Sequence, residues 1–203
     1  MKRICFVFSL AIILAGCSTP TQTEQQQATT SQLISILAAY FPPDGSTAYF
    51  QGEGNEFASY TLQTTYIDES SIAQIENNGG VTLLKVYRMT NAAIELVYME
   101  AVDETPTLPS AQEIAMFPVI ETILQLPLKV GSRFNGWEIL STTASITTEY
   151  NTFHDVMEIR KITDTITTTK YFAKGMGLIQ IKDEMVTTNQ TSFIITSTLQ
   201  KIE

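Results

Sequence analysis

A short polar cluster in the first third of the chain holds the side chains best suited to chemistry. It comprises Glu53, Asn55, Glu56 and Tyr60, so that two carboxylates flank an amide and an aromatic residue follows. Such a group could bind a polar ligand, or the two carboxylates could act as an acid and base pair on a glycosidic bond. The same Asn and Glu could instead hydrogen bond to the backbone of a tight turn and hold a hairpin. We favour the structural role and keep the ligand site as the functional hypothesis.

Serine hydrolase chemistry is not supported by the sequence. His154 is the only histidine, and Asp155 follows it directly. On a strand, neighbouring side chains point to opposite faces, so this pair cannot form the linear relay that a catalytic triad needs. The sequence also contains no Gly-x-Ser-x-Gly motif. We therefore predict an exposed histidine and a protein that is not an enzyme.

Metal and cofactor sites lack the necessary ligands. Zinc sites use three or four nitrogen and sulfur ligands, whereas the chain has one His and two Cys. Calcium loops combine clustered oxygen ligands with a glycine, and acidic pairs such as Asp68-Glu69 fit solvated turns instead. Gly52 and Gly54 precede a predicted strand, so no helix N-terminus is available there for a phosphate. We predict no metal and no cofactor.

The second cysteine lies in a distinctive N-terminal context. Lys2 and Arg3 precede a largely apolar run of 12 residues, 4–15. That run is shorter than the roughly 20 residues of a membrane-spanning helix but typical of a signal peptide. Leu14-Ala15-Gly16-Cys17 then resembles the lipobox of bacterial lipoproteins. The resemblance implies that the Cys17 thiol carries a diacylglycerol and that cleavage occurs just before it.

The lipobox implies a location and a domain organisation. Residues 1–16 are the expected signal peptide, which removes Cys5, and a lipid with two or more acyl chains on Cys17 would hold the protein stably on the extracytoplasmic face of the cell membrane. Residues 18–31 read STPTQTEQQQATTS and contain no large apolar side chain. We therefore predict a disordered tether over residues 17–31 and one globular domain over residues 32–203.

The charge of the chain argues against nucleic acid as a partner. The formal net charge is −9 at pH 7, and removal of Lys2 and Arg3 with the signal peptide changes it to −11. A negative surface repels phosphates and anionic headgroups. We expect neither nucleic acid binding nor a polybasic contact with the membrane, so the lipid alone would attach the protein.

Apolar periodicity predicts one helix followed by many strands. Residues 32–41 (QLISILAAYF) end at Pro42-Pro43 and predict a short helix. Residues 57–67 alternate with the period of a half-buried strand, and further strands are predicted at 81–89, 93–100, 137–141, 145–150, 156–162, 165–172, 178–182 and 191–199. Residues 110–113 fit a capping box for a second short helix. We predict an α+β fold, predominantly antiparallel β, with a strongly curved sheet or a sandwich and a short N-terminal helix.

Four ordered motifs extend the likeness to known lipoproteins. They are Tyr40-Phe41-Pro42, residues 52–60 (GEGNEFASY), residues 126–131 (LPLKVG) and residues 171–178 (YFAKGMGL). In this order they resemble a group of uncharacterised lipoproteins of Gram-positive bacteria that combine a lipobox with a β-rich domain. The resemblance implies a location and a fold but no activity.

Two functions remain open. The first is a membrane-anchored, non-enzymatic binding or scaffolding module for an unidentified protein, cell-wall or apolar partner. The alternative is a carrier that encloses a lipid or other hydrophobic ligand in its curved sheet, lined by residues 33–41 with Met89, Met99, Met116 and Phe117. We favour a role for these residues in the core. A carrier needs a cavity of several hundred Å³, whereas a scaffold is densely packed, so cavity volume separates the two.

Overall fold

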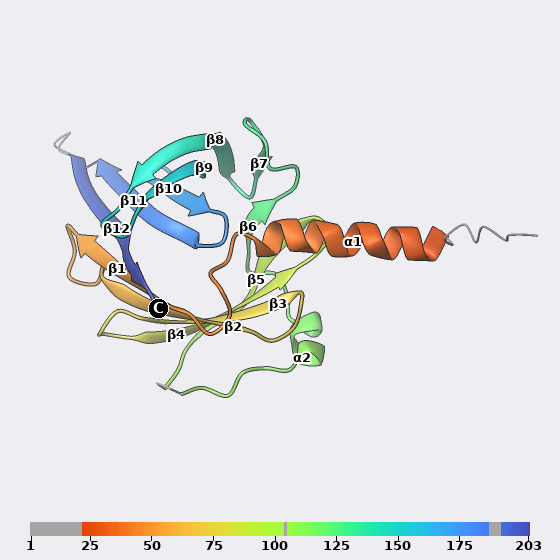
Figure 1. Ribbon diagram of the computed structural model, residues 1–203. Coiled ribbons are helices and arrows are strands. Elements are labelled where there is room, and N and C mark those ends of the chain that lie inside the picture. The colour runs from red at the N-terminus through yellow and green to blue at the C-terminus, as the bar shows by residue number, and fades with distance from the viewer. Residues whose placement is uncertain (1–21, 104, 187–191) are drawn as a thin grey trace, which may run out of the picture.

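All the strands that the structure describes belong to one antiparallel sheet (Figure 1). The computed structural model describes residues 22–103, 105–186 and 192–203. The elements are α1 (Gln22–Ala38), β1 (Thr47–Glu53), β2 (Tyr60–Tyr66), β3 (Ser71–Asn77), β4 (Thr82–Met89), β5 (Ala93–Ala101), α2 (Ala111–Met116), β6 (Glu121–Gln125), β7 (Arg133–Phe134), β8 (Trp137–Thr147), β9 (Thr152–Ile162), β10 (Ile166–Ala173), β11 (Gly177–Val186) and β12 (Ser192–Ile202).

The sheet runs β6-β5-β4-β3-β2-β1-β12-β11-β10-β9-β8-β7. Nearly every strand therefore pairs with its neighbours in the chain, as in a simple meander. The exception to local pairing is β1, which joins β12 and so connects the first strand to the last; Phe50, for example, lies opposite Leu199. The sheet has its two edges at β6 and β7, in the middle of the sequence.

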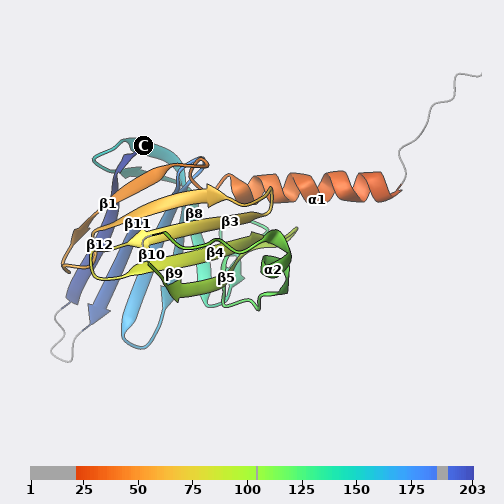
Figure 2. The same cartoon turned by 90° about the horizontal axis from the view of Figure 1, so that it is seen from below.

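The sheet curves until its two edges approach each other, which gives a nearly closed, barrel-like shape (Figures 1 and 2). This confirms the predicted predominance of antiparallel β and the strongly curved sheet. The sandwich alternative is wrong, because the β1–β12 pairing makes the two halves of the chain one continuous sheet. A sandwich would need two separate sheets packed face to face.

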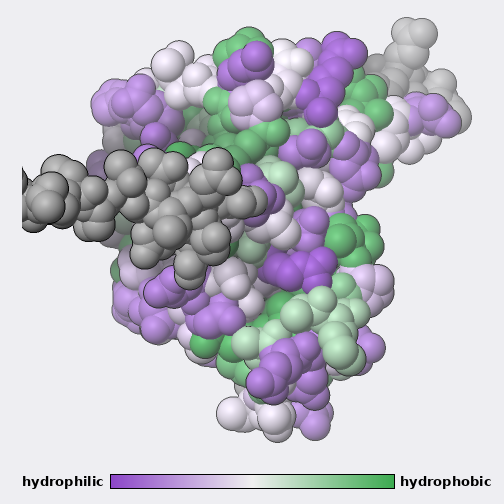
Figure 3. Space-filling model, turned by 90° about the vertical axis from the view of Figure 1, so that its right-hand side faces the viewer, coloured by the Kyte–Doolittle hydropathy of each residue, from purple (hydrophilic) through white to green (hydrophobic). Residues whose placement is uncertain are grey.

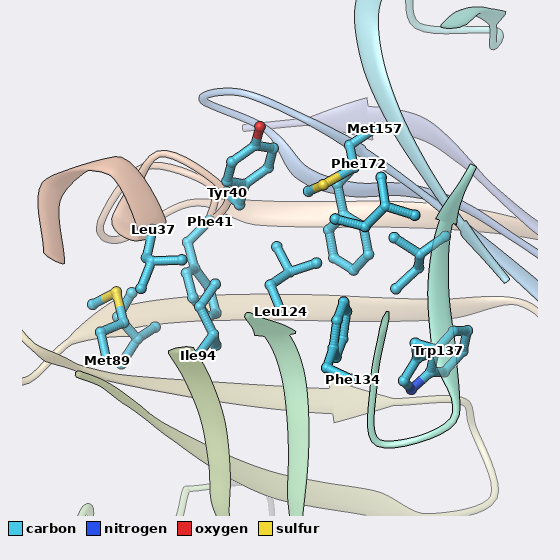
Figure 4. Close-up of a cluster of buried hydrophobic side chains, with 13 residues drawn as sticks. Leu37, Tyr40, Phe41, Met89, Ile94, Leu124, Phe134, Trp137, Met157 and Phe172 are labelled. Atoms are coloured by element: carbon cyan, nitrogen blue, oxygen red, sulfur yellow. The ribbon is translucent and has the colours of Figure 1, made fainter. Parts of the chain in front are cut away.

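Both faces of the sheet bury apolar side chains. Along β4, Leu84 and Val86 are buried on the convex face, where they pack with Ile114 of α2. Lys85 and Tyr87 alternate with them and face inward, since successive side chains of a strand point to opposite faces. The largest buried cluster lies on the concave face and includes Phe41, Ile94, Leu124, Trp137 and Phe172 (Figure 4).

Helix α1 differs from the expected short helix. It begins at Gln22, within the segment predicted as a tether, and it ends at Ala38. Gln, Glu and Ala are favourable in helices, so residues 22–31 continue a helix that is anchored at its other end. The fully buried Leu37 provides this anchor, together with Ile34 and Ala38. The rest of α1 extends away from the sheet (Figures 1 and 2).

The segment after α1 connects the helix to the β10–β11 turn. The Gly175 amide donates a hydrogen bond to the Ala39 carbonyl at 2.6 Å. Gly177 has φ +71°, and a Cβ at this position would lie 2.9 Å from Pro42 Cδ and 3.1 Å from the Tyr40 carbonyl oxygen. Two of the four sequence motifs, residues 40–42 and 171–178, are therefore in direct contact, and glycine is required where they meet.

The short helix α2 matches its sequence signal. Ser110 is its N-cap, and the reciprocal bonds of a capping box with Glu113 are both present. Neither helix, over the residues that the structure describes, has the length and apolar character needed to cross a bilayer.

Candidate functional site

A small pocket lies inside the curved sheet, between the β2–β5 half and the β10–β11 hairpin. Its volume is about 110 Å³, and Tyr40, Phe41 and Pro42 form part of its wall. Apolar side chains line one part of it, including Ile94, Phe172, Leu178 and Ile181. The polar side chains of the wall are Tyr60, Gln74, Glu76, Lys85, Tyr87 and Lys170. We call this space the interior pocket.

Strand register brings the polar groups of β3 and β4 together. Gln74 lies directly opposite Lys85, and both face inward. Lys85 Nζ forms an ion pair with Glu76 Oε2 at 2.5 Å. Gln74 Nε2 donates a hydrogen bond to Thr64 Oγ1 at 3.1 Å. Glu76, Lys85 and Gln74 thus have partners within the sheet.

Lys170 approaches the pocket from the opposite wall. It lies on β10, and its Nζ is 4.7 Å from the centroid of the Trp137 ring. Burial lowers the pKa of Lys170, because desolvation disfavours the charged form. Among nearby charges, Glu121 and Asp183 act to raise that pKa, while Lys85 and Lys161 act to lower it.

Two tyrosines complete the polar wall. Tyr60 stacks on Phe50 with ring centroids 4.5 Å apart, and Tyr87 meets Phe41 edge-on at 5.2 Å. Burial raises the pKa of both hydroxyls, and the negative charge of Glu76 adds to this effect. Both phenols therefore remain neutral at ordinary pH and can act as hydrogen-bond donors.

Trp137 links the pocket to the seam between the two edges of the sheet. Its Nε1 donates a hydrogen bond to Glu121 Oε1 at 3.2 Å. Lys161 Nζ lies 3.6 Å from the same oxygen and 5.6 Å from the Trp137 ring. The indole is thus placed between two lysines and held by one carboxylate.

The structure separates the residues proposed from the sequence as one site. Tyr60 faces the interior pocket, whereas Glu53, Asn55 and Glu56 are exposed. Glu53 lies at the end of β1, in phase with the exposed Gln51 rather than the buried Phe50. Asn55 Oδ1 accepts a hydrogen bond from the Phe57 amide at 2.7 Å, as expected for a residue that holds a turn.

Other sequence expectations have different outcomes. His154 is exposed, as predicted, and its Nδ1 lies 3.0 Å from Ser145 Oγ. Within residues 22–103, 105–186 and 192–203, no three His, Cys, Asp or Glu side chains gather in a way that could hold a metal ion. Cys17, the predicted lipidation site, lies outside the described residues.

The residues suggested for a hydrophobic cavity do not line a common space. Met89 is in the main core, while Met99 is 45% exposed and Met116 is 82% exposed. Phe117 stacks on Tyr98, with ring centroids 5.4 Å apart. Leu37, Tyr40 and Phe41 are buried, which confirms that this part of residues 33–41 belongs to the core.

Lys170, Tyr87 and Trp137 were not singled out from the sequence, although a signal exists for the first two. Lys170 alternates in phase with the buried Phe172, and Lys85 alternates in phase with Tyr87 on an inward face. A lysine at a strand position whose neighbours two residues away face inward indicates that the inside of the sheet contains polar groups.

Taken together, the fold and the pocket define a predominantly antiparallel β protein with a small polar interior site.

No known protein family matches the chain, and no curated protein matches it. Solved structures that share general similarity include the following two. One is a candidate lipoprotein from Parabacteroides distasonis, with a TM-score of 0.47 and 15% identity over 81% of this chain and 98% of that chain. The other is a candidate exported protein with a YmcC-like fold from Bacteroides fragilis, with a TM-score of 0.44 and 13% identity over the same shares of the two chains. The expected resemblance to lipoproteins of Gram-positive bacteria finds no support in these comparisons.

Proposed function

We propose that the protein is a lipid-anchored extracytoplasmic lipoprotein whose β-rich domain is a non-enzymatic binding or scaffolding module. The observation that carries the choice of module over carrier is the volume of the interior pocket. It measures about 110 Å³, whereas sites for ligands of ordinary size occupy about 300–1,000 Å³. A lipid chain does not fit this space, so partners would contact the outer surface of the domain.

The geometry of α1 supports an anchored arrangement. The helix packs through Leu37 at its C-terminal end and otherwise extends away from the sheet, so that its first residue, Gln22, lies at its far end (Figures 1 and 2). A helix of 17 residues is about 25 Å long at 1.5 Å per residue. In the proposed arrangement α1 is a stalk that separates the sheet from the membrane surface.

The outer surface around this stalk would remain available to a partner. Viewed along α1, hydrophilic and hydrophobic side chains are interspersed over the face of the domain (Figure 3). Interfaces of non-obligate complexes are about as apolar as the rest of a protein surface, so a face of this kind is compatible with a protein or cell-wall partner.

Metabolic labelling tests the anchor. Cells that express the full-length chain are grown with an alkyne analogue of palmitate and then fractionated. We expect the wild-type protein to be labelled and membrane-bound, and the Cys17→Ser variant to lose both properties. Cys5→Ser is the matched control, because Cys5 lies in the predicted signal peptide, and it should keep the label. Undiminished labelling of Cys17→Ser would contradict the anchor.

Native mass spectrometry tests the module against the carrier. The wild-type protein is extracted in detergent and its mass is measured under native and denaturing conditions. We expect the same mass in both, equal to the chain with its covalent lipid. A stoichiometric lipid that denaturation removes would support the carrier and overturn our choice.

A further inference from the structure

We propose that the interior pocket binds a small carboxylate of two or three carbons, with Lys170 as its counter-ion. This site goes beyond the proposed module, because it concerns the inside of the sheet rather than its outer surface. Unpartnered donors, the position of one lysine and the size of the pocket support it.

Three hydrogen-bond donors face the pocket without a partner in the protein. Over the residues that the structure describes, Lys170 Nζ and the hydroxyls of Tyr60 and Tyr87 form no hydrogen bond, and Lys170 forms no ion pair. All three side chains are half-buried, and all three line the same small space. Polar groups in folded proteins are almost always satisfied by protein, water or ligand. None of these three atoms is sealed from solvent, because among the described residues only Arg160 Nε is buried without a partner. Water or a ligand in the pocket would therefore accept their hydrogen bonds.

The charges around the pocket balance, with Lys85, Lys161 and Lys170 against Glu76, Glu121 and Asp183, but Lys170 lacks a direct ion-pair partner. Glu76 pairs with Lys85 at 2.5 Å, and Glu121 accepts from Trp137 and lies near Lys161. Asp183 accepts a hydrogen bond from Thr168 Oγ1 at 2.5 Å. Among the charged side chains that line the pocket, Lys170 is thus the one without an opposite charge in contact. A ligand with a single negative charge would supply the direct contact that Lys170 lacks.

The size and lining of the pocket restrict the anion further. A volume of about 110 Å³ exceeds the roughly 10–15 Å³ that one water requires and is below the roughly 300 Å³ of the smallest ordinary ligand sites. The apolar part of the pocket is lined by Ile94, Phe172 and Leu178. A carboxylate has two acceptor oxygens for the ammonium and the phenols, and a methyl or ethyl group suits the apolar part. Fatty acids are too long, and a phosphate dianion would need a second cation.

The single tryptophan of the chain provides a direct readout. Trp137 lies 4.7 Å from Lys170 Nζ, so its emission should respond to an anion that binds there. The full-length protein in detergent is titrated with sodium acetate at constant ionic strength, with sodium chloride as the replacement salt. We expect a saturable change for the wild type and affinity at least tenfold weaker for Lys170→Met. Because this substitution also alters the surroundings of Trp137, affinity is measured independently from the line width of ¹³C-acetate.

Matched variants keep the test informative if Lys170→Met folds poorly. Lys174→Met removes an exposed lysine from the adjacent turn and should bind acetate as the wild type does. Tyr87→Phe removes one donor and keeps the ring, so it should weaken binding several-fold. Unchanged affinity in both Lys170→Met and Tyr87→Phe would overturn the site. So would a wild-type protein that shows no saturable response, or an equal response to chloride.

Larger anions test the size argument. Propionate should bind and octanoate should not, and inorganic phosphate should compete weakly at most. Octanoate binding tighter than acetate would show that the pocket opens, which would contradict the size limit. It would leave the membrane anchor untouched, so failure of this inference and failure of the anchor are distinguishable.

Discussion

Glu121 and Trp137 join the two edges of the sheet. Glu121 is on the edge strand β6, and its Oε1 accepts a hydrogen bond at 3.2 Å from Nε1 of Trp137 on β8, next to the other edge strand β7. The edges form no backbone ladder with each other among the described strands, so side chains bridge the seam where hydrogen-bonded strands would otherwise close it.

The seam contact should contribute measurably to stability. Replacing Glu121 with Ala leaves the enclosed indole N–H and Lys161 without their partner. We expect the free energy of unfolding to fall by about 1–3 kcal/mol, measured by urea denaturation with Trp137 fluorescence. Glu138→Ala is the control, because it removes an ion pair whose Arg133 side chain is 75% exposed, which should cost about 1 kcal/mol or less. Equal losses would show that the seam has no special role.

At Gly177, where the β10–β11 turn contacts the segment after α1, we expect any side chain to destabilise the fold. Gly175 and Gly177 both have positive φ, at +75° and +71°, so alanine at either position should cost about 1–2 kcal/mol of backbone strain. At Gly177 the new Cβ also meets Pro42 and the Tyr40 carbonyl, while at Gly175 it meets nothing within 4 Å. We expect Gly177→Ala to be the more destabilising by about 1–3 kcal/mol in thermal or urea unfolding. A smaller effect at Gly177 than at Gly175 would contradict the contact.

Alkaline pH should destabilise the domain through its interior tyrosines. The pKa of Tyr60 and that of Tyr87 are raised by burial, so above pH 10 the unfolded chain releases protons that the folded chain retains. The stability contribution of these groups is therefore complete below about pH 10 and declines as pH rises further. Urea unfolding at pH 9, 10 and 11 should show a shallower decline for Tyr60→Phe/Tyr87→Phe than for the wild type. An exposed control, Tyr150→Phe, should behave as the wild type.

The capping box of α2 should affect the pKa of the Glu113 carboxylate. The pKa of Glu113 is lowered mainly by the backbone hydrogen bond from Ser110 and further by the bond from its side chain. We expect Ser110→Ala to raise the pKa of Glu113 part of the way to its ordinary value, because the backbone bond remains. Carboxyl ¹³C NMR measures both values. The stability that the Glu113 carboxylate provides is fully present above its ordinary pKa and is lost as pH falls through its lowered, folded-state pKa. An unchanged pKa of Glu113 in the Ser110→Ala variant would refute the role of the Ser110 side chain.

Local signals in the sequence predicted much of the meander. The Asn-Gly turn at 135–136 connects β7 to β8, with positive φ at both residues, and residues 57–67 alternate as β2 does. β3 (SIAQIEN) was missed because its first four residues are all buried, so no alternation marks it. The pairing of β1 with β12 was also beyond reach, since it joins segments that share no local pattern.

The interior site was only partly accessible from the sequence. Tyr60 was selected as a neighbour of Glu53 and Glu56, yet strand alternation places it on the opposite face, beside Tyr87 and Lys170. The site depends on the curvature that brings β2–β4 to face β10. Curvature arises from strand twist and from pairing across the whole sheet, which a pattern within one segment does not report.

The pairing of first strand with last also sets an order of events during synthesis. Every other pairing of the sheet joins consecutive strands, whereas β1 receives its second partner only when β12, the final long strand, has been made. Until then its backbone N–H and C=O groups offer a template to any extended chain nearby. The β1 edge is thus open to misassociation until β12 has been made, and the pairing of β12 with β1 ends this exposure.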